Sequence, residues 1–327
     1  MARIEIVDGA AFPCEAGDTL LRAGLRAGLG LPYECNAGGC GTCKVELVEG
    51  AVDNLWPEAP GLSDRDRRKG RVLACQSRPS GDCRLRLRLD PACVPPVRPV
   101  RRGARLVGIA DITRDIREFR FRAEGPADFL PGQYALLSLP DGLERAYSLS
   151  NTANDAGEWH FQIRRVPGGR MTGQLFDDPP AAVMLDGPYG LAHLREGPRD
   201  VVCVAGGSGL APMVSIARGI AADPADRRRV HFFHGGRAAP DLPGEAWARD
   251  LTGLGSRLDY HPAVSDEAAP GLPKGYIHDI LAAWLGERLD AFDFYCAGPP
   301  PMVQALEALL IAEKGLPPGR VRFDRFF

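Results

Sequence analysis

The stretch Cys35-Asn36-Ala37-Gly38-Gly39-Cys40-Gly41-Thr42-Cys43 carries the strongest local signal in this sequence, and Cys75 follows it in Leu73-Ala74-Cys75-Gln76. Its cysteines have the spacing C-x4-C-x2-C. Thiolates that converge from one short loop require unusual backbone dihedral angles, and the glycines between them permit such angles. The stretch therefore predicts a loop that gathers three cysteine side chains at one point, with Cys75 as a fourth.

Four thiolates at this spacing are the ligands of a plant-type 2Fe-2S cluster. The loop amides can point at the cluster sulfurs and stabilise the negative charge gained on reduction. A zinc site usually contains two C-x2-C pairs, and the second pair is missing. The predicted cluster ligands are Cys35, Cys40, Cys43 and Cys75, whereas Cys14, Cys83, Cys93, Cys203 and Cys296 are expected to be packing residues.

The overall composition excludes several classes of protein. The 327 residues include 40 Lys plus Arg against 42 Asp plus Glu, and a formal net charge of −2 gives no reason to expect nucleic acid or an anionic membrane as a partner. Residues 1–8 lack the apolar region of a secretory signal, and no apolar stretch reaches the ~20 residues of a membrane-spanning helix. A cytoplasmic location is expected, where cysteines serve metal or redox chemistry more often than disulfides.

Hydrophobic patterning divides the chain into three blocks and one linker. Residues 1–92 contain the cysteine loop, strand-like alternation at 3–7 and 44–48, and a helical pattern at 19–26. Residues 93–103 are rich in proline, which prevents helix and disfavours sheet pairing, so an extended linker is expected there.

Two further blocks follow the linker. Residues 104–196 show short strands separated by Gly and Pro, which favours an antiparallel barrel. Residues 197–327 alternate buried strands, such as 201–205, with helical stretches, which is typical of a parallel α/β sheet. The predicted architecture is therefore multidomain.

The middle block offers residue types that suit a flavin. Arg145-Ala146-Tyr147-Ser148 ends one strand-like segment, and Arg170-Met171-Thr172 follows another. A flavin needs an aromatic face for its ring and cationic or amide donors for its pyrophosphate. In isolation, however, the R-x-Y-S pattern is more typical of a surface turn.

The last block offers a turn that suits a dinucleotide. Gly206-Gly207-Ser208-Gly209 follows a β-branched strand and opens a helix that contains Pro212. Glycine lets the backbone approach a pyrophosphate, and a helix N-terminus favours an anion. Because the G-x-G-x-x-G fingerprint is absent, a plain tight turn is an equal alternative. Arg237 and Gly298-Pro299 end later strands, where ligands of open α/β sheets bind.

These motifs, in this order, resemble the ferredoxin–NADP reductase superfamily over essentially the whole chain. Within it, the sequence is similar to the reductase components of bacterial aromatic-ring oxygenases and, more narrowly, of toluene monooxygenases. The narrower likeness rests on residues 32–36, 54–57, 186–190 and 323–327. The resemblance implies a β-grasp ferredoxin domain (1–92), an antiparallel β-barrel FAD domain (104–196) and an α/β parallel-sheet NAD-binding domain (197–327).

The resemblance also implies roles for individual residues. Tyr147 would lie against the flavin ring, Ser148 near flavin N5, and the terminal Phe327, or Phe326, over the other face. No acid–base residue is expected, because the cofactors carry the chemistry. The implied FAD contacts are Arg145, Ala146, Tyr147, Ser148, Arg170, Met171, Thr172 and Phe327, and the implied NADH contacts are Gly206, Gly207, Ser208, Gly209, Pro212, Arg237, Gly298 and Pro299.

One position departs from the family pattern. The family usually has Cys directly before the last Gly-Pro motif, where this chain has Ala297, and Cys296 comes one residue earlier. One residue changes the face of a strand. No catalytic role is therefore assigned to Cys296.

The expected activity is that of an NADH:ferredoxin oxidoreductase that uses FAD and the cluster. The implied partner is a Rieske-type ferredoxin or the diiron hydroxylase of the same oxygenase. NADH is expected over NADPH because Asp241 offers a carboxylate that suits a ribose hydroxyl and repels a 2′-phosphate, and residues 238–242 contain no second cation.

Two alternatives stay open. A reductase of a Rieske dioxygenase, or of a phenol or alkene monooxygenase, would have the same chemistry and another acceptor. A non-catalytic redox sensor would need no intact nucleotide site, although all three dinucleotide motifs are present.

Overall fold

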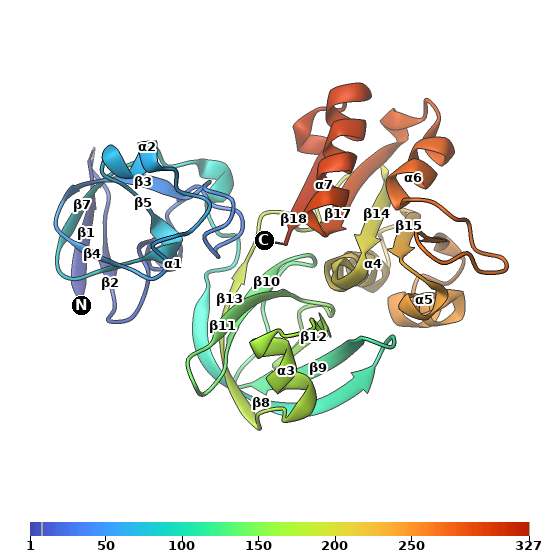
Figure 1. Cartoon of the computed structure of the whole chain (residues 1–327), viewed down its shortest axis with the longest axis horizontal. Helices are drawn as coiled ribbons and strands as arrows, with labels where there is room; N and C mark the ends of the chain where they lie inside the picture. Colours follow the sequence, from blue (N-terminus) through green and yellow to red (C-terminus); the bar gives the residue numbers. More distant parts are fainter. Residues whose placement is uncertain (8, 327) are drawn as a thin grey trace. The chain divides into compact units, whose positions relative to one another are not determined.

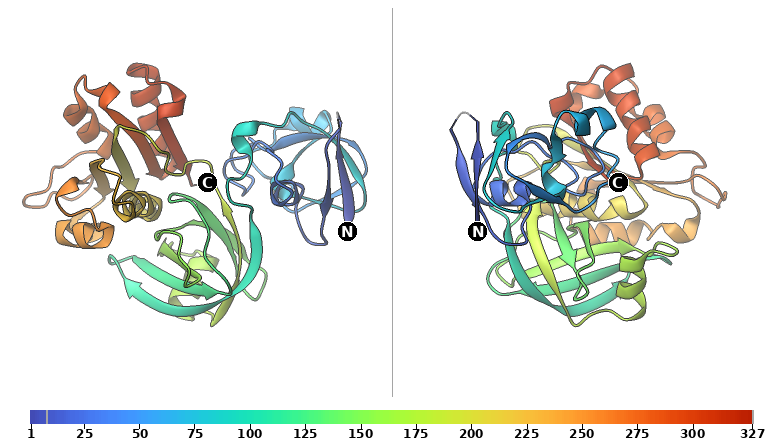
Figure 2. Two further views of the ribbon diagram at one scale, coloured as in Figure 1. Left: turned by 180° about the vertical axis from the view of Figure 1, so that it is seen from behind. Right: turned by 60° about the vertical axis from the view of Figure 1, so that its left-hand side comes forward.

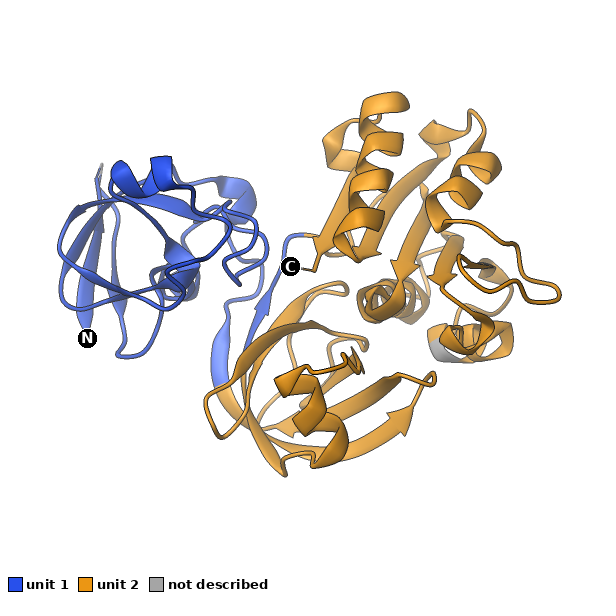
Figure 3. Ribbon diagram, viewed as in Figure 1, with its two compact units in different colours: residues 1–101, 186–191, 327 blue, residues 102–185, 192–326 orange. Residues whose placement is uncertain are grey.

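The computed structural model describes residues 1–7 and 9–326 (Figure 1). The chain forms two compact units, which Figure 3 colours separately. Unit 1 comprises Met1–Arg101 and the short segment Asp186–Leu191, and unit 2 comprises Arg102–Leu185 and Ala192–Phe326. The domain limits expected from the sequence remain predictions.

Unit 1 is built on a mixed five-stranded sheet in the order β2-β1-β7-β3-β5. Strands β1 and β7 are parallel, and the other ladders are antiparallel. Helix α1 (Leu20–Arg26) begins after Thr19, whose side chain accepts a hydrogen bond from the Arg22 amide, and its leucines are buried. The strands are β1 (Ala2–Ile6), β2 (Ala11–Cys14), β3 (Lys44–Glu49), β5 (Arg71–Leu73) and β7 (Cys83–Arg86); β4 (Val52–Asn54) and β6 (Ser77–Pro79) form a separate ribbon, and α2 is Asp64–Arg68.

The middle of the chain forms a six-stranded sheet in the order β11-β10-β13-β8-β9-β12. A bridge between Leu149 and Phe161 brings the end of β11 beside β12, which closes the sheet into a barrel around an aromatic core. Strand β8 begins directly after Pro99, so residues 100–103 of the expected linker are strand. The elements are β8 (Val100–Asp111), β9 (Ile116–Ala123), β10 (Tyr134–Ser138), β11 (Glu144–Ser148), β12 (Glu158–Arg164), α3 (Arg170–Asp177) and β13 (Ala182–Tyr189).

The rest of the chain forms a parallel five-stranded sheet in the order β16-β15-β14-β17-β18. Helices α4 and α5 pack on one face and α6 and α7 on the other, each with its own apolar core (Figures 1 and 2). The elements are β14 (Asp200–Gly206), α4 (Leu210–Ala222), β15 (Val230–Gly236), α5 (Glu245–Thr252), β16 (Leu258–Val264), α6 (Ile277–Leu285), β17 (Phe292–Gly298), α7 (Pro300–Glu307) and β18 (Val321–Arg325). The predicted three-part fold class is confirmed.

Candidate redox and nucleotide-binding sites

The cysteine loop of unit 1 places the four predicted ligands in two close pairs. The Sγ atoms of Cys43 and Cys75 lie 3.2 Å apart. In the other pair, the thiol of Cys35 hydrogen-bonds to Cys40 and lowers the pKa of Cys40 to about 5. The amide of Cys40 in turn donates to Cys35 Sγ at 3.5 Å. In each pair, the thiol of one cysteine hydrogen-bonds to the other sulfur and lowers the pKa of that second cysteine, which is Cys40 in one pair and Cys75 in the other.

Two pairs of thiols suit a two-iron cluster better than a single metal ion. Among the residues that the structure describes, no group of three or more His, Cys, Asp or Glu side chains is placed to hold one ion. A 2Fe-2S cluster takes four cysteine sulfurs, two for each iron. The amides of Ala37 and Thr42 point at Cys35 Sγ and Cys40 Sγ, at 3.4 and 3.5 Å, and such donors stabilise a reduced cluster. The donor set thus fits the predicted cofactor.

A turn of unit 1 covers the cysteine loop. Gly41 has φ +77°, and a Cβ on it would lie 2.5 Å from the Gly61 carbonyl oxygen, so no other residue fits there. The Gly61 amide donates to the Gly38 carbonyl at 3.0 Å. The Trp56 ring packs against Gly38 and is still 42% exposed. The outer side of the loop is therefore close to solvent.

The first group of predicted flavin residues lies at the end of β11. Ser148 is buried, and its hydroxyl donates to Asp324 Oδ2 at 2.6 Å. Tyr147 is half-buried, and burial raises the pKa of its phenol. The guanidinium of Arg145 is exposed and donates to the Glu144 carbonyl. The strand thus offers a ring, a hydroxyl and a cation, and Ala146 lies between them.

The second group lies at the start of α3. The helix begins after Gly169, which provides no side-chain cap. The first N–H groups of a helix have no acceptor within it, so they can bind an anion. Arg170 is 78% exposed next to them, whereas Met171 and Thr172 are buried. An uncapped helix start beside an exposed guanidinium, which lies 3.7 Å from Asp141 Oδ2, suits a pyrophosphate. In Met171 and Thr172 only the backbone is available for it.

A cleft of about 450 Å³ lies at the carboxyl ends of the parallel strands. Of the predicted NADH contacts, Gly206, Gly207, Arg237 and Pro299 line it. The other predicted residues, Ser208, Gly209, Pro212 and Gly298, are not among the lining residues. Gly209 has a packing role, because a Cβ on it would lie 1.9 Å from the Ala297 carbonyl oxygen. In the predicted turn, Gly206 and Gly207 therefore line the cleft, whereas Gly209 allows the turn to pack closely against β17.

Asp241 is not the free carboxylate that the sequence suggested. It is buried, and its oxygens accept hydrogen bonds from the Arg237 amide and Nε at 3.0 and 3.2 Å. Arg114, from the turn between β8 and β9, donates Nε to Asp241 at 2.8 Å. This second cation is 127 positions away in sequence, so the segment 238–242 could not reveal it. Burial raises the pKa of Asp241, but Arg237 and Arg114 outweigh it and the net shift is downward.

Sequence reasoning missed several residues of the cleft. Asp115 and Arg164 come from the barrel, and they form an ion pair with Arg164 Nε at 2.7 Å from Asp115 Oδ2. Tyr276 and His278, at the start of α6, stack with ring centroids 5.6 Å apart. The carboxyl end of β16 could have pointed to the α6 residues, but nothing local marks the barrel residues.

Three further predictions concern the chain end and β17. Phe327 lies outside the described residues. Phe326 is partly buried against the core on the α4 side of the parallel sheet. Cys296 is fully buried on β17, and burial raises the pKa of its thiol. Asp324, the partner of Ser148, was not among the predicted residues.

Three family models match the chain. They are a 2Fe-2S iron-sulfur cluster binding domain over residues 5–80, an oxidoreductase FAD-binding domain over 103–193 and an oxidoreductase NAD-binding domain over 203–308. The chain is 40% identical to the ferredoxin–NAD(P)(+) reductase CarAd of Metapseudomonas resinovorans, over 100% of both chains. It is 42% identical to the ferredoxin–NAD(+) reductase component of the alkene monooxygenase system of Xanthobacter autotrophicus, over 98% of each.

More distant relatives and a solved structure agree with this. The xylene/toluene monooxygenase electron transfer component XylA of Pseudomonas putida is 33% identical over 98% of this chain and 91% of its own length. The ferredoxin reductase in carbazole 1,9a-dioxygenase superposes with a TM-score of 0.92 at 36% identity, covering 100% of this chain and 98% of that one. No helix in the described part of the chain is long and apolar enough to cross a membrane. The chain therefore belongs to the ferredoxin–NAD(P)(+) reductase components of multicomponent oxygenase systems, oxidoreductases with FAD, NAD and 2Fe-2S cluster sites.

Proposed function

We propose that the chain takes electrons from NADH and delivers them singly to a Rieske-type ferredoxin or to the diiron hydroxylase of an aromatic oxygenase of toluene monooxygenase type. The observation that carries the proposal is the presence, in one polypeptide, of two thiol pairs and a nucleotide cleft of about 450 Å³. A redox sensor would need the thiols and not the cleft. When bound, FAD supplies the conversion of a hydride donor into a one-electron source, and the cluster supplies one-electron transfer.

The residues of the chain bind, orient and shield these groups. Cys35, Cys40, Cys43 and Cys75 would hold the cluster, and the amides around them would stabilise added negative charge. The start of α3 would bind the FAD pyrophosphate, with Arg170 as counter-ion. The hydroxyl of Ser148 is held in one orientation by Asp324. Ser148 and Tyr147 would contact the flavin ring.

The charges around the cleft support NADH over NADPH, for a reason other than a free carboxylate. Arg237 is paired with Asp241, at 3.2 Å, and with Asp115, at 3.5 Å. Arg114 is paired with Asp241 at 2.7 Å. Among the described residues that line the cleft, both guanidinium groups that a 2′-phosphate would meet, those of Arg164 and Arg237, already have a carboxylate partner. The two carboxylates would repel its charge.

The comparisons favour a second candidate for the oxygenase system that accepts the electrons. The relative at 40% identity is the reductase CarAd, and the relative at 42% identity is the reductase component of an alkene monooxygenase system. XylA is only 33% identical. The toluene-type assignment rests on short segments such as residues 54–57. An alkene monooxygenase or a ring dioxygenase is therefore the alternative acceptor system.

One experiment tests both levels of the proposal. The purified holoprotein is mixed anaerobically with NADH, and the visible flavin and iron–sulfur bands are followed. Bleaching of both bands supports the reductase, and bleaching of neither would refute it. Each candidate acceptor is then added in turn, with NADPH in place of NADH as the nucleotide control. The acceptor that restores the bands fastest identifies the system.

A further inference from the structure

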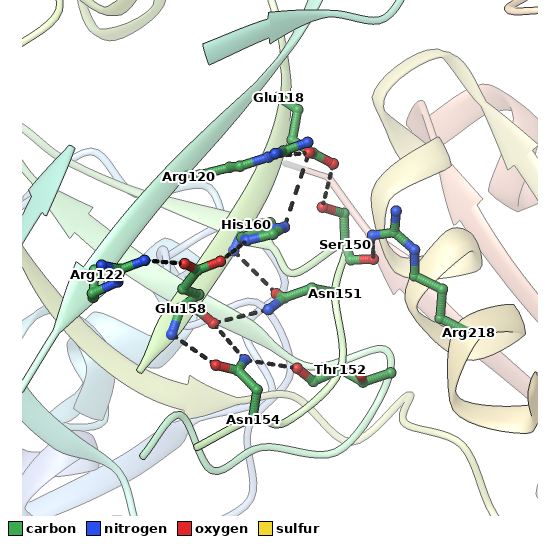
Figure 4. Close-up of polar contacts among 10 residues, drawn as sticks. All are labelled: Glu118, Arg120, Arg122, Ser150, Asn151, Thr152, Asn154, Glu158, His160 and Arg218. Atoms are coloured by element: carbon green, nitrogen blue, oxygen red, sulfur yellow. Dashed lines mark hydrogen bonds and ion pairs between the residues drawn. The ribbon is translucent and has the colours of Figure 1, made fainter. Parts of the chain in front are cut away.

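The segment that follows Ser148 is tied to the barrel by a network of polar contacts (Figure 4). Asn151 accepts a hydrogen bond from the His160 amide at 3.0 Å and donates to the Glu158 carbonyl at 2.8 Å. The Ser150 amide donates to the His160 carbonyl at 2.9 Å. Strand β12 therefore fixes residues 149–151 from one side, directly after the predicted flavin contact Ser148.

Helix α4 holds the same segment from the other side. Ser215 is fully buried, and its hydroxyl donates to the Asn151 carbonyl at 2.7 Å. Arg218, one turn further along α4, donates Nη1 to the Ser150 carbonyl at 2.9 Å. The buried Glu118 carboxylate attracts the Arg218 guanidinium, although burial of the guanidinium lowers the pKa of Arg218 overall. The backbone carbonyl groups of Ser150 and Asn151 thus both accept hydrogen bonds from one face of α4.

The same helix carries the nucleotide turn at its N-terminus. Residues 207–209 form a single turn of 3-10 helix that runs directly into α4 at Leu210. Gly207 lines the cleft, so the position of α4 sets the position of the nucleotide turn. A helix is stiff along its axis, and Ser215 and Arg218 lie within three turns of the cleft.

We propose that Ser215 and Arg218 are positioning residues, which fix the nucleotide turn relative to Ser148 and thereby set the geometry of hydride transfer. The inference rests on the proposed function. A misplacement of about 1 Å far from the reacting atoms can cost ~100-fold in rate, because proximity effects depend steeply on geometry. Removal of Arg218 should therefore lower the rate of hydride transfer without weakening nucleotide binding, since the guanidinium does not line the cleft.

The test compares Arg218→Ala, Arg218→Lys and Ser215→Ala with the control Arg227→Ala in the full-length holoprotein. Arg227 is an exposed arginine just beyond α4, and no hydrogen bond or ion pair of its side chain occurs among the described residues. Three quantities are measured: the limiting rate of flavin reduction at saturating NADH, the NADH dissociation constant, and the amide hydrogen exchange of residues 148–154.

We expect Arg218→Ala to lower the limiting rate at least ~10-fold, to leave the dissociation constant within ~3-fold, and to speed exchange of residues 148–154. Ser215→Ala should act in the same direction, Arg218→Lys should recover part of the rate, and Arg227→Ala should behave as the parent. An unchanged limiting rate in Arg218→Ala and Ser215→Ala would overturn the inference, and so would a loss confined to the dissociation constant. If the parent protein itself fails to be reduced by NADH, the proposed function fails instead.

Discussion

Arg26→Ala tests how the segment Asp186–Leu191 is held in unit 1. The Asp186 side chain has no exposed surface, and Arg26 donates to both of its oxygens at 2.7 and 2.8 Å. Removal of one partner of a buried ion pair typically costs ~3–5 kcal/mol, because the other charge stays buried. Arg22 lies 4.0 Å from the same carboxylate, so we expect the lower end of that range, ~3 kcal/mol.

The assay is a urea titration of the full-length protein, followed through the visible absorbance of the bound cluster. With an m-value of ~1–3 kcal/mol per M urea for a small domain, a loss of ~3 kcal/mol would lower the urea midpoint by ~1–3 M. Arg65→Ala, which removes an exposed arginine from α2, is the control and should leave the transition unchanged. A loss below ~1 kcal/mol in Arg26→Ala would refute the reasoning, since it would mean that the carboxylate finds water or another cation.

The pH dependence of the same variant has a definite sign. Burial raises the pKa of Asp186, but the hydrogen bonds from Arg26 outweigh it and the net pKa is lowered. In the parent, the pair therefore stabilises unit 1 above the unfolded pKa of ~3.9, and this contribution is lost as the pH falls through the lower folded value. Without Arg26, burial dominates and the pKa of Asp186 rises. The destabilisation of the variant relative to the parent should then shrink as the pH falls through this raised pKa, and an identical pH profile would count against this account.

Three further predictions concern the redox and nucleotide sites. Cys75→Ser should lose iron and the visible iron–sulfur bands while the flavin absorbance stays, as metal analysis and spectra will show; full iron content would exclude Cys75 as a ligand. Asp241→Asn should raise the ratio of kcat/KM for NADPH to that for NADH by ~10-fold, because it removes one of the two carboxylates paired with Arg237, and an unchanged ratio would show that the 2′-phosphate binds elsewhere. Trp56→Ala should slow reduction of the protein acceptor several-fold and leave ferricyanide reduction by NADH unchanged, because Trp56 is 42% exposed on the cysteine loop; equal loss with both acceptors would mean that the loop itself is damaged.

Much of the fold follows from local patterns. The alternation at residues 3–7 and 44–48 and the helical spacing at 19–26 correspond to β1, β3 and α1. Each pattern reflects one element that must bury one side against a core. Residues 100–103, at the end of the expected linker, belong to β8 because Pro99 is the last proline of the run and nothing after it prevents strand pairing.

Some contacts in the candidate sites also follow from local sequence, whereas others depend on the fold. Cysteines eight residues apart in one glycine-containing loop cannot separate far in space, so their grouping could be predicted from spacing alone. Cys75 required a resemblance or the fold, because it reaches Cys43 from 32 residues away. The partner of Ser148 lies 176 residues further along the chain, at Asp324, and no local pattern indicates that contact.

The sequence by itself determined the grouping of Cys35, Cys40 and Cys43 in one loop, the order of the three folded blocks and the positions of the glycine turns, because each depends on short-range steric and hydrophobic constraints. Only the tertiary structure decided which charges meet. Arg26 pairs with Asp186 across 160 residues, and Arg114 pairs with Asp241 across 127. An ion pair depends on distance in space, and spatial distance between remote residues exists only once the chain has folded.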